Sequence, residues 1–105
     1  MKGSTESMAK VTFNRAGTLL CAYLSGEIDH HSAQDLRERI DSQLLSVSPE
    51  RLVLDFAGVT FMDSSGLGLI LGRMRRMQGL GGELTVQHLP DQIKKVLDLA
   101  GVSYV

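Results

Sequence analysis

The sequence predicts an α/β domain with a mixed β-sheet flanked by helices, in which an N-terminal hairpin precedes strand–helix repeats. Two strand-like segments, 10–14 and 18–25, are separated by the turn Ala16-Gly17, which is typical of an antiparallel hairpin. Downstream of the hairpin, apolar residues recur alternately at strand spacing and at helix spacing. Strands that alternate with helices favour one sheet with right-handed crossovers.

The first helix is expected to begin after the second strand. Gly26 interrupts the strand pattern, and Asp29 and His30 follow as residues suited to capping a helix. Pro49 ends the helical pattern. The apolar residues at helical spacing are Ala33, Leu36, Ile40, Leu44 and Val47.

The rest of the chain predicts three further strands and two helices. Segment 52–56 shows little alternation, as expected of a strand covered on both faces. A helix is expected over about 64–78, a strand over 83–88 and a last strand over 102–105. Pro90 suits the first turn of a third helix and Gly101 its end. The expected inner face of that helix consists of Ile93, Val96, Leu97 and Ala100.

Composition sets limits on the function. The chain has 105 residues, enough for one domain, and its 11 basic and 12 acidic residues give a net charge of −1. This balance provides no field to hold nucleic acid or an anionic membrane, so we expect neither as a partner. The single Cys21 cannot form an internal disulfide, and a reduced cytoplasmic setting fits it. Residues 1–8 are expected to be a disordered tail or a remnant of cloning, and 9–105 the domain.

The most informative motif is the segment 61–68, Phe-Met-Asp-Ser-Ser-Gly-Leu-Gly. It places two hydroxyls and a carboxylate at the start of a predicted helix, where unpaired N–H groups stabilise an anion. Ser64 or Ser65 is therefore a candidate for reversible phosphorylation. The ordinary alternative is a serine that only caps the helix.

The predicted helix 64–78 also contains an unusual pattern. Leu69 falls opposite the expected core-facing stripe, which resembles a docking patch for a protein, although a single exposed leucine is also ordinary. Its neighbours on that side are Ser65, Gly72, Arg73 and Arg76. The stripe itself consists of Leu67, Ile70, Leu71, Met74 and Met77.

Three glycines, Gly66, Gly68 and Gly72, each cost this helix roughly 1 kcal/mol relative to alanine. Close approach of a partner's backbone would offset that cost. Close packing of the helix on the protein's own sheet is the alternative explanation. The pattern favours it about equally for Gly68 and less for Gly72.

Acidic residues follow two predicted parallel strands. Asp29 and Asp63 should meet at one edge of the sheet, near Ser64. As a metal site, Asp29-His30-His31 is weak, because no other ligand has useful spacing.

Enzymatic functions find little support, and we expect no catalytic residue and no cofactor. The glycines after Ser65 miss the dinucleotide fingerprint by one residue, and the glycine that a hydrolase elbow needs before its serine is absent. The competing class is a receiver-like domain with Asp55 as phosphoacceptor, although the acidic pair and the lysine of receivers are missing.

Segments 26–33 and 61–73 together closely resemble the STAS domain family, and within it the anti-sigma factor antagonists of endospore-forming bacteria. The resemblance covers about residue 10 to the C-terminus. It implies a mixed sheet flanked by helices and a sporulation-type partner switch. Family members usually continue into another helix, whereas this chain stops at Val105, so we expect either a truncated sequence or a member that lacks this helix.

The resemblance also implies the partners. The unphosphorylated protein binds an anti-sigma factor that is itself a serine kinase, with ATP or ADP bound to the kinase, and this binding frees the sigma factor. The kinase phosphorylates Ser64, and a PP2C-type phosphatase reverses the step. The expected contact residues are Asp29, His30, Asp63, Ser65, Gly66, Gly68, Leu69, Gly72 and Arg73.

Overall fold

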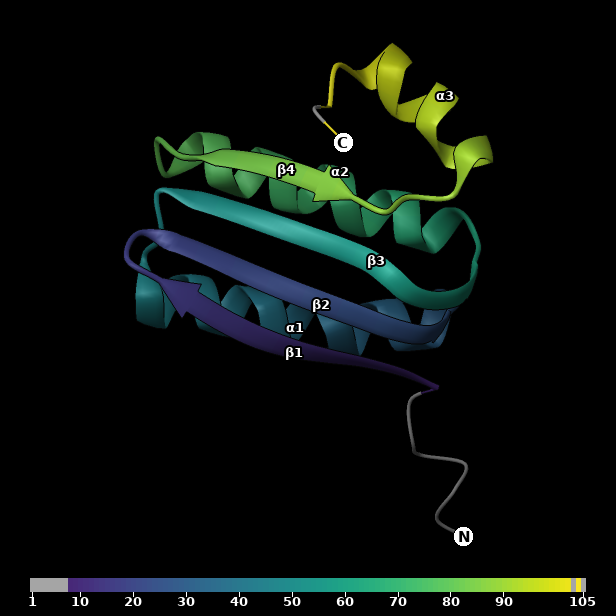
Figure 1. Cartoon of the computed structure of the whole chain (residues 1–105), viewed down its shortest axis with the longest axis horizontal. Helices are drawn as coiled ribbons and strands as arrows, with labels where there is room; N and C mark the ends of the chain where they lie inside the picture. Colours follow the sequence, from purple (N-terminus) through teal and green to yellow (C-terminus); the bar gives the residue numbers. More distant parts are fainter. Residues whose placement is uncertain (1–7, 103, 105) are drawn as a thin grey trace, which may run out of the picture.

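Four strands form one sheet in the order β1-β2-β3-β4 (Figure 1). The computed structural model describes residues 8–102 and 104, apart from the side chain of Gln92. β1 (Ala9–Ala16) pairs antiparallel with β2 (Leu19–Ile28), as the predicted hairpin requires. β3 (Arg51–Met62) is parallel to β2, and β4 (Glu83–Gln87) is parallel to β3. The predicted mixed sheet is therefore confirmed.

The N-terminal tail was expected to end at Met8, and β1 begins at the next residue, Ala9. The Met8 carbonyl accepts a hydrogen bond from the Glu27 amide at 3.2 Å, so Met8 extends the pairing of β1 with β2 by one contact. The remainder of the expected tail, residues 1–7, lies outside the described residues.

Helices α1 (His30–Val47) and α2 (Ser64–Gly79) both lie on one face of the sheet, behind it in Figure 1. Every second residue from Leu20 to Leu24 in β2 and from Leu52 to Phe56 in β3 faces these helices and is buried, as the pleat of a strand dictates. The buried residues are Leu20, Ala22 and Leu24 of β2, Leu52, Leu54 and Phe56 of β3, and Leu36, Ile40 and Leu44 of α1.

β3 is not covered on both faces, contrary to the expectation from its weak alternation. Val53 and Asp55 point to the face opposite α1 and α2, where Val53 is half-buried. Asp55 is buried in this position, and its partners are described below. The strand also runs six residues beyond the predicted end at Phe56, and most of this extension is exposed.

Helix α3 (Asp91–Ala100) begins after Pro90 and ends at Gly101, which has a positive φ of 76°, as predicted. Its expected inner face is partly wrong, because Val96 and Ala100 are exposed. Leu97 is fully buried and Ile93 packs partly against the core.

The expected last strand appears as one parallel bridge between Val86 and Tyr104. Residues 103 and 105, which that strand would include, lie outside the described residues.

Candidate functional site: the start of helix α2

The carboxyl ends of β2 and β3 lie side by side and place Asp29 and Asp63 at the same edge of the sheet. Ile28 and Met62, the last residues of the two strands, are paired. The Asp63 amide donates to the Ile28 carbonyl at 3.1 Å, so the alignment continues one residue past β3. The predicted meeting of the two acids is confirmed.

Ser64 is the first residue of α2, and Asp63 is its N-cap. One carboxylate oxygen of Asp63, Oδ1, accepts a hydrogen bond from the Ser65 amide at 2.8 Å, and its carbonyl accepts one from Gly66 at 3.0 Å. Asp63 thus performs the capping that the sequence also allowed for a serine. Ser64 is exposed, and its hydroxyl has no hydrogen-bond partner within residues 8–102 and 104, whereas Ser65 is half-buried. Ser64 is the more accessible of the two hydroxyls.

Asp29 caps α1 in a reciprocal arrangement with Ser32. Its Oδ1 accepts from the Ser32 amide at 2.8 Å, and the Asp29 amide donates to Ser32 Oγ at 2.9 Å. The hydrogen bond from the Ser32 backbone is the main cause that lowers the pKa of Asp29, so this carboxylate is negative at neutral pH. His30 follows as the first residue of α1, with an exposed side chain.

The three glycines of α2 differ in what surrounds them. Gly66 is buried, and a Cβ at this position would collide with the side chain of Met62. Gly66 therefore packs against the protein's own strand, and it does not fit the expected partner surface. Gly68 and Gly72 have open space where a Cβ would lie, so packing on the protein's own sheet explains neither of them.

Leu69 and Arg73 are buried, and the expectation that they form an exposed docking patch is wrong. Leu69 is 4% exposed and Arg73 is 6% exposed. The buried face of α2 is rotated from the predicted stripe by about one residue, which is 100° on a helical wheel. Leu67, Leu71 and Met74 are half-buried at its border. The buried residues are Gly66, Leu69, Ile70, Arg73 and Met77.

Arg73 is buried because an acidic residue of the neighbouring helix neutralises it. Its Nε lies 2.9 Å from Oδ1 of Asp41 on α1, and Nε of Arg76 lies 3.7 Å from the same oxygen. Burial lowers the pKa of Arg73, and the Asp41 carboxylate opposes this effect. A sequence pattern identifies Arg73 as polar, but the partner on another helix becomes visible only in the fold.

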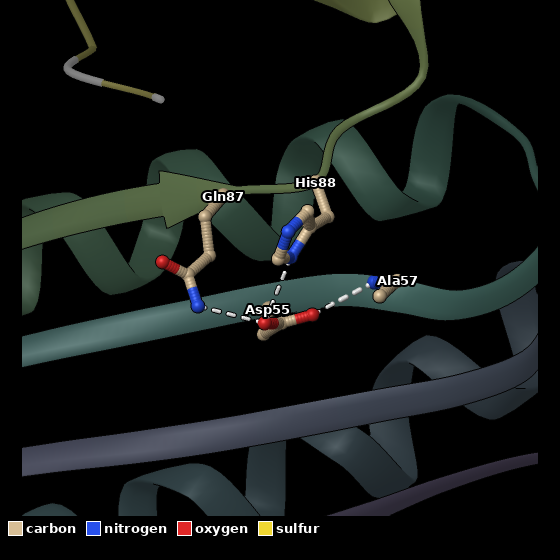
Figure 2. Close-up of polar contacts among 4 residues, drawn as sticks. All are labelled: Asp55, Ala57, Gln87 and His88. Carbon is tan, nitrogen blue, oxygen red and sulfur yellow. Dashed lines mark hydrogen bonds and ion pairs between the residues drawn. The ribbon is translucent and has the colours of Figure 1, made fainter.

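A second polar cluster surrounds Asp55 on the open face of the sheet (Figure 2). Asp55 Oδ1 accepts from the Ala57 amide at 2.8 Å. Oδ2 accepts from Gln87 Nε2 at 2.7 Å and lies 3.0 Å from His88 Nδ1. Burial would raise the pKa of Asp55, but these hydrogen bonds outweigh it and lower the pKa. A buried carboxylate with both oxygens engaged does not suit a phosphoacceptor, so the receiver-like alternative lacks support.

Within the described residues, no group of three or more His, Cys, Asp or Glu side chains is arranged to hold a metal ion. No helix in the described part of the chain combines the length and the apolar content that crossing a membrane requires.

Comparison with known proteins places this geometry in a family. Residues 10–105 match the family model of the STAS domain. The chain belongs to the STAS domain family. An anti-sigma F factor antagonist of Paenibacillus polymyxa is 38% identical over 84 residues, which span 80% of this chain and 72% of that protein. The anti-sigma-B factor antagonist of Bacillus subtilis (strain 168) is 32% identical over 79 residues, 75% of this chain and 71% of the relative. This STAS protein is thus an anti-sigma factor antagonist by family.

Solved structures agree with this assignment. The anti-sigma factor antagonist SpoIIAA in its unphosphorylated form superposes on the STAS protein with a TM-score of 0.78 at 27% identity. The alignment covers 91% of this chain and 87% of that one. The Bacillus cell fate determinant SpoIIAA in its phosphorylated form gives the same TM-score at 26% identity, with 91% and 89% covered. The predicted STAS fold is confirmed.

Proposed function

We propose that this protein is a phosphorylation-controlled binding switch rather than an enzyme. In its unphosphorylated form it binds an anti-sigma factor that is a serine kinase with ATP or ADP bound, and this binding releases a sigma factor in the cytoplasm. The observation that carries the proposal is the position of Ser64, which is exposed, unpartnered among the described residues and located at the start of α2. The names of the relatives, and a neighbour solved in a phosphorylated form, support it.

The covalent step is a phosphoryl transfer to Ser64. The kinase transfers the γ-phosphoryl group of ATP to Ser64 Oγ, which loses its proton, and ADP remains. A PP2C-type phosphatase hydrolyses the phosphoserine with water and returns the hydroxyl and inorganic phosphate. We expect this cycle to accompany sporulation, as the resemblance of segments 26–33 and 61–73 to the antagonists of endospore-forming bacteria implies.

Phosphorylation should change binding much more than it changes folding. A phosphate adds about −1.5 to −2 charges. At a helix N-terminus this charge is favourable by about 0.3–1 kcal/mol, so the fold should tolerate it. An uncompensated charge trapped against a partner costs about 3–5 kcal/mol, which is about 100-fold to several-thousand-fold in affinity. Asp63, the adjacent N-cap, adds repulsion between like charges.

The proposed contact surface consists of residues that lie around Ser64 and are at least partly exposed. Gly68 and Gly72 have room for a partner's backbone to approach α2 closely. Gly66, Leu69 and Arg73 are excluded from the surface because they are buried. The remaining contact residues are Asp29, His30, Asp63, Ser65, Gly68 and Gly72.

Two substitutions at Ser64 test the proposal with a purified probe, the anti-sigma F factor of Paenibacillus polymyxa. We expect wild type and Ser64→Ala to bind it in calorimetry, and Ser64→Asp to lose at least about 100-fold in affinity. Ser64→Asp should keep its circular-dichroism spectrum and melt within a few degrees of wild type, because the change belongs to the interface.

Labelling with radioactive ATP provides the control for the phosphorylated residue. Wild type should accept one phosphate and Ser64→Ala none. Single-site labelling of Ser64→Ala would move the switch to Ser65. Equal affinity of the phosphorylated and unphosphorylated proteins for the probe would refute the switch itself.

A further inference from the structure

The C-terminal half of β3 has a neighbouring strand on one side only. β4 pairs with β3 from Arg51 to Asp55, whereas the pairing of β3 with β2 continues to Met62. In Figure 1, β4 ends beside the middle of β3, and the chain then leaves toward α3. Within the described residues, no strand therefore lies along the β4-facing side of 56–62, which we call the β3 edge. Such an edge presents unpaired backbone N–H and C=O groups.

Asp55 marks the point where β4 and β3 separate (Figure 2). Its carboxylate satisfies the Ala57 amide on β3 and holds Gln87 and His88 at the end of β4. His88 has a φ of 58°, in the left-handed region, and the chain turns away from β3 at this residue. The β3 edge therefore begins where β4 separates from β3, and the hydrogen bonds of Asp55 fix this position.

The β3 edge lacks the protection that exposed strand edges normally carry. Its sequence, Phe-Ala-Gly-Val-Thr-Phe-Met over 56–62, contains no charged residue and no proline. Proteins usually place charges or proline on free edges to prevent pairing with other chains. The outer edge strand β1 follows this rule, since it carries the exposed residues Lys10 and Arg15.

Most residues of the β3 edge are exposed, whereas Phe56 is buried and Val59 and Met62 are half-buried. Phe61 is 53% exposed, and Ala57, Gly58 and Thr60 are exposed as well. Two register shifts interrupt the β2–β3 pairing in this half of the strand. Bulges of this kind are frequent beside functional sites, where they re-aim side chains. An uncharged, exposed strand edge with a phenylalanine is suited to a partner strand.

We propose that the β3 edge binds an extended, uncharged segment of the anti-sigma factor, which adds to the sheet as a strand beside β3. A row of backbone donors and acceptors is matched best by another backbone, as in peptide recognition by strand addition. The edge ends at Met62, two residues before Ser64, so a strand along it passes next to the phosphorylation site. This inference rests on the proposed function, because it names the contact that the Ser64 switch would control.

Thr60→Lys tests the inference, because it adds a charge in the middle of the β3 edge at an exposed position. The substitution also removes the 3.3 Å hydrogen bond from Thr60 Oγ1 to the Gly26 carbonyl of β2, and Thr60→Val, which removes that bond without adding a charge, should keep wild-type affinity. Thr12→Lys is the matched control, since Thr12 is exposed on the edge strand β1. With the Paenibacillus polymyxa anti-sigma F factor as probe, we expect Thr60→Lys to lose at least about tenfold in affinity and Thr12→Lys less than about twofold. Both variants should keep the melting temperature of wild type within a few degrees.

Hydrogen exchange supplies a second measurement that does not depend on a substitution. Backbone amides of residues 58–62 that exchange rapidly in the free protein should become protected in the complex. Wild-type affinity of Thr60→Lys together with unchanged exchange would overturn the strand addition, and the Ser64 switch would stand if Ser64→Asp still lost binding.

The remaining outcomes also decide the matter. If light scattering shows that Thr60→Lys dissociates a dimer while probe binding is unchanged, the edge pairs with a second copy and the inference is wrong. If wild type does not bind the probe, the proposed function and this inference fail together.

Discussion

Asp55 is a buried carboxylate that accepts hydrogen bonds from the Ala57 amide and Gln87 Nε2 and lies 3.0 Å from His88 Nδ1. Because the hydrogen bonds keep its pKa below the ordinary value, the unfolded chain binds a proton at Asp55 more readily than the folded chain does. The resulting stability is fully present above the unfolded pKa of about 3.9 and is lost as the pH falls through the lower folded pKa. Gln87 and His88 would then lose a charged acceptor.

Asp55→Asn tests this role. We expect the variant to be less stable than wild type at pH 7 by about 1–3 kcal/mol, because an amide nitrogen would face the donors of Gln87 or His88. The difference should shrink as the pH falls below about 4. Urea unfolding of both proteins between pH 2 and 7 measures it, and a difference that is independent of pH would contradict a charged Asp55.

A substitution at Leu69 tests whether this side chain belongs to the hydrophobic core. Leu69→Ala should cost about 2–5 kcal/mol of the free energy of unfolding, because it leaves a cavity between α2 and the sheet. Leu80→Ala is the control, since Leu80 is 60% exposed, and it should change stability by less than about 0.5 kcal/mol. Equal urea midpoints for the two variants would place Leu69 at the surface after all.

Helix α2 is an element in which glycine serves two purposes. Gly68→Ala should raise stability by about 1 kcal/mol, because alanine favours the helix and a Cβ meets open space. Gly66→Ala gains the same propensity, but it forces Met62 to move, and overpacking of this kind costs about 1–3 kcal/mol. Thermal melts should therefore place Gly68→Ala above wild type and Gly66→Ala clearly below Gly68→Ala.

The same pair separates folding from partner binding. If Gly68 is retained so that a partner's backbone can approach, Gly68→Ala should bind the anti-sigma F factor more weakly although it is more stable. A more stable variant with unchanged affinity would show that the partner does not approach α2 at this glycine.

At the scale of the whole molecule, Asp41 and Arg73 join the two helices that cover the sheet. Asp41→Asn leaves the buried guanidinium without its counter-charge and should cost about 3–5 kcal/mol. Asp41→Asn combined with Arg73→Met should recover part of this loss, because the unpaired charge is removed. A double-mutant cycle in urea measures the coupling, and strictly additive effects would mean that the pair contributes nothing to helix packing.

Much of this architecture follows from local patterns in the sequence. The hairpin, the span of α1, the Asp29 cap, the start of α2 at Ser64 and the end of α3 at Gly101 all depend on neighbours within a few residues. Parallel pairing of the strands that precede Asp29 and Asp63 was also predictable, since strand–helix repeats bring the carboxyl ends of parallel strands to one edge.

The orientation of α2, in contrast, was decided by the tertiary structure. A helical wheel ranks the faces of a helix by hydrophobicity. It assigned the core to the face that carries Leu67, Leu71 and Met74, which are only half-buried. Arg73 could be buried because Asp41 of another helix lies 2.9 Å away, a contact that spans 32 residues of sequence. The length of β3 and its free edge likewise depend on where β4 ends. Local propensity selects elements, whereas charge pairing and strand pairing between distant segments decide which of their surfaces remain open to a partner.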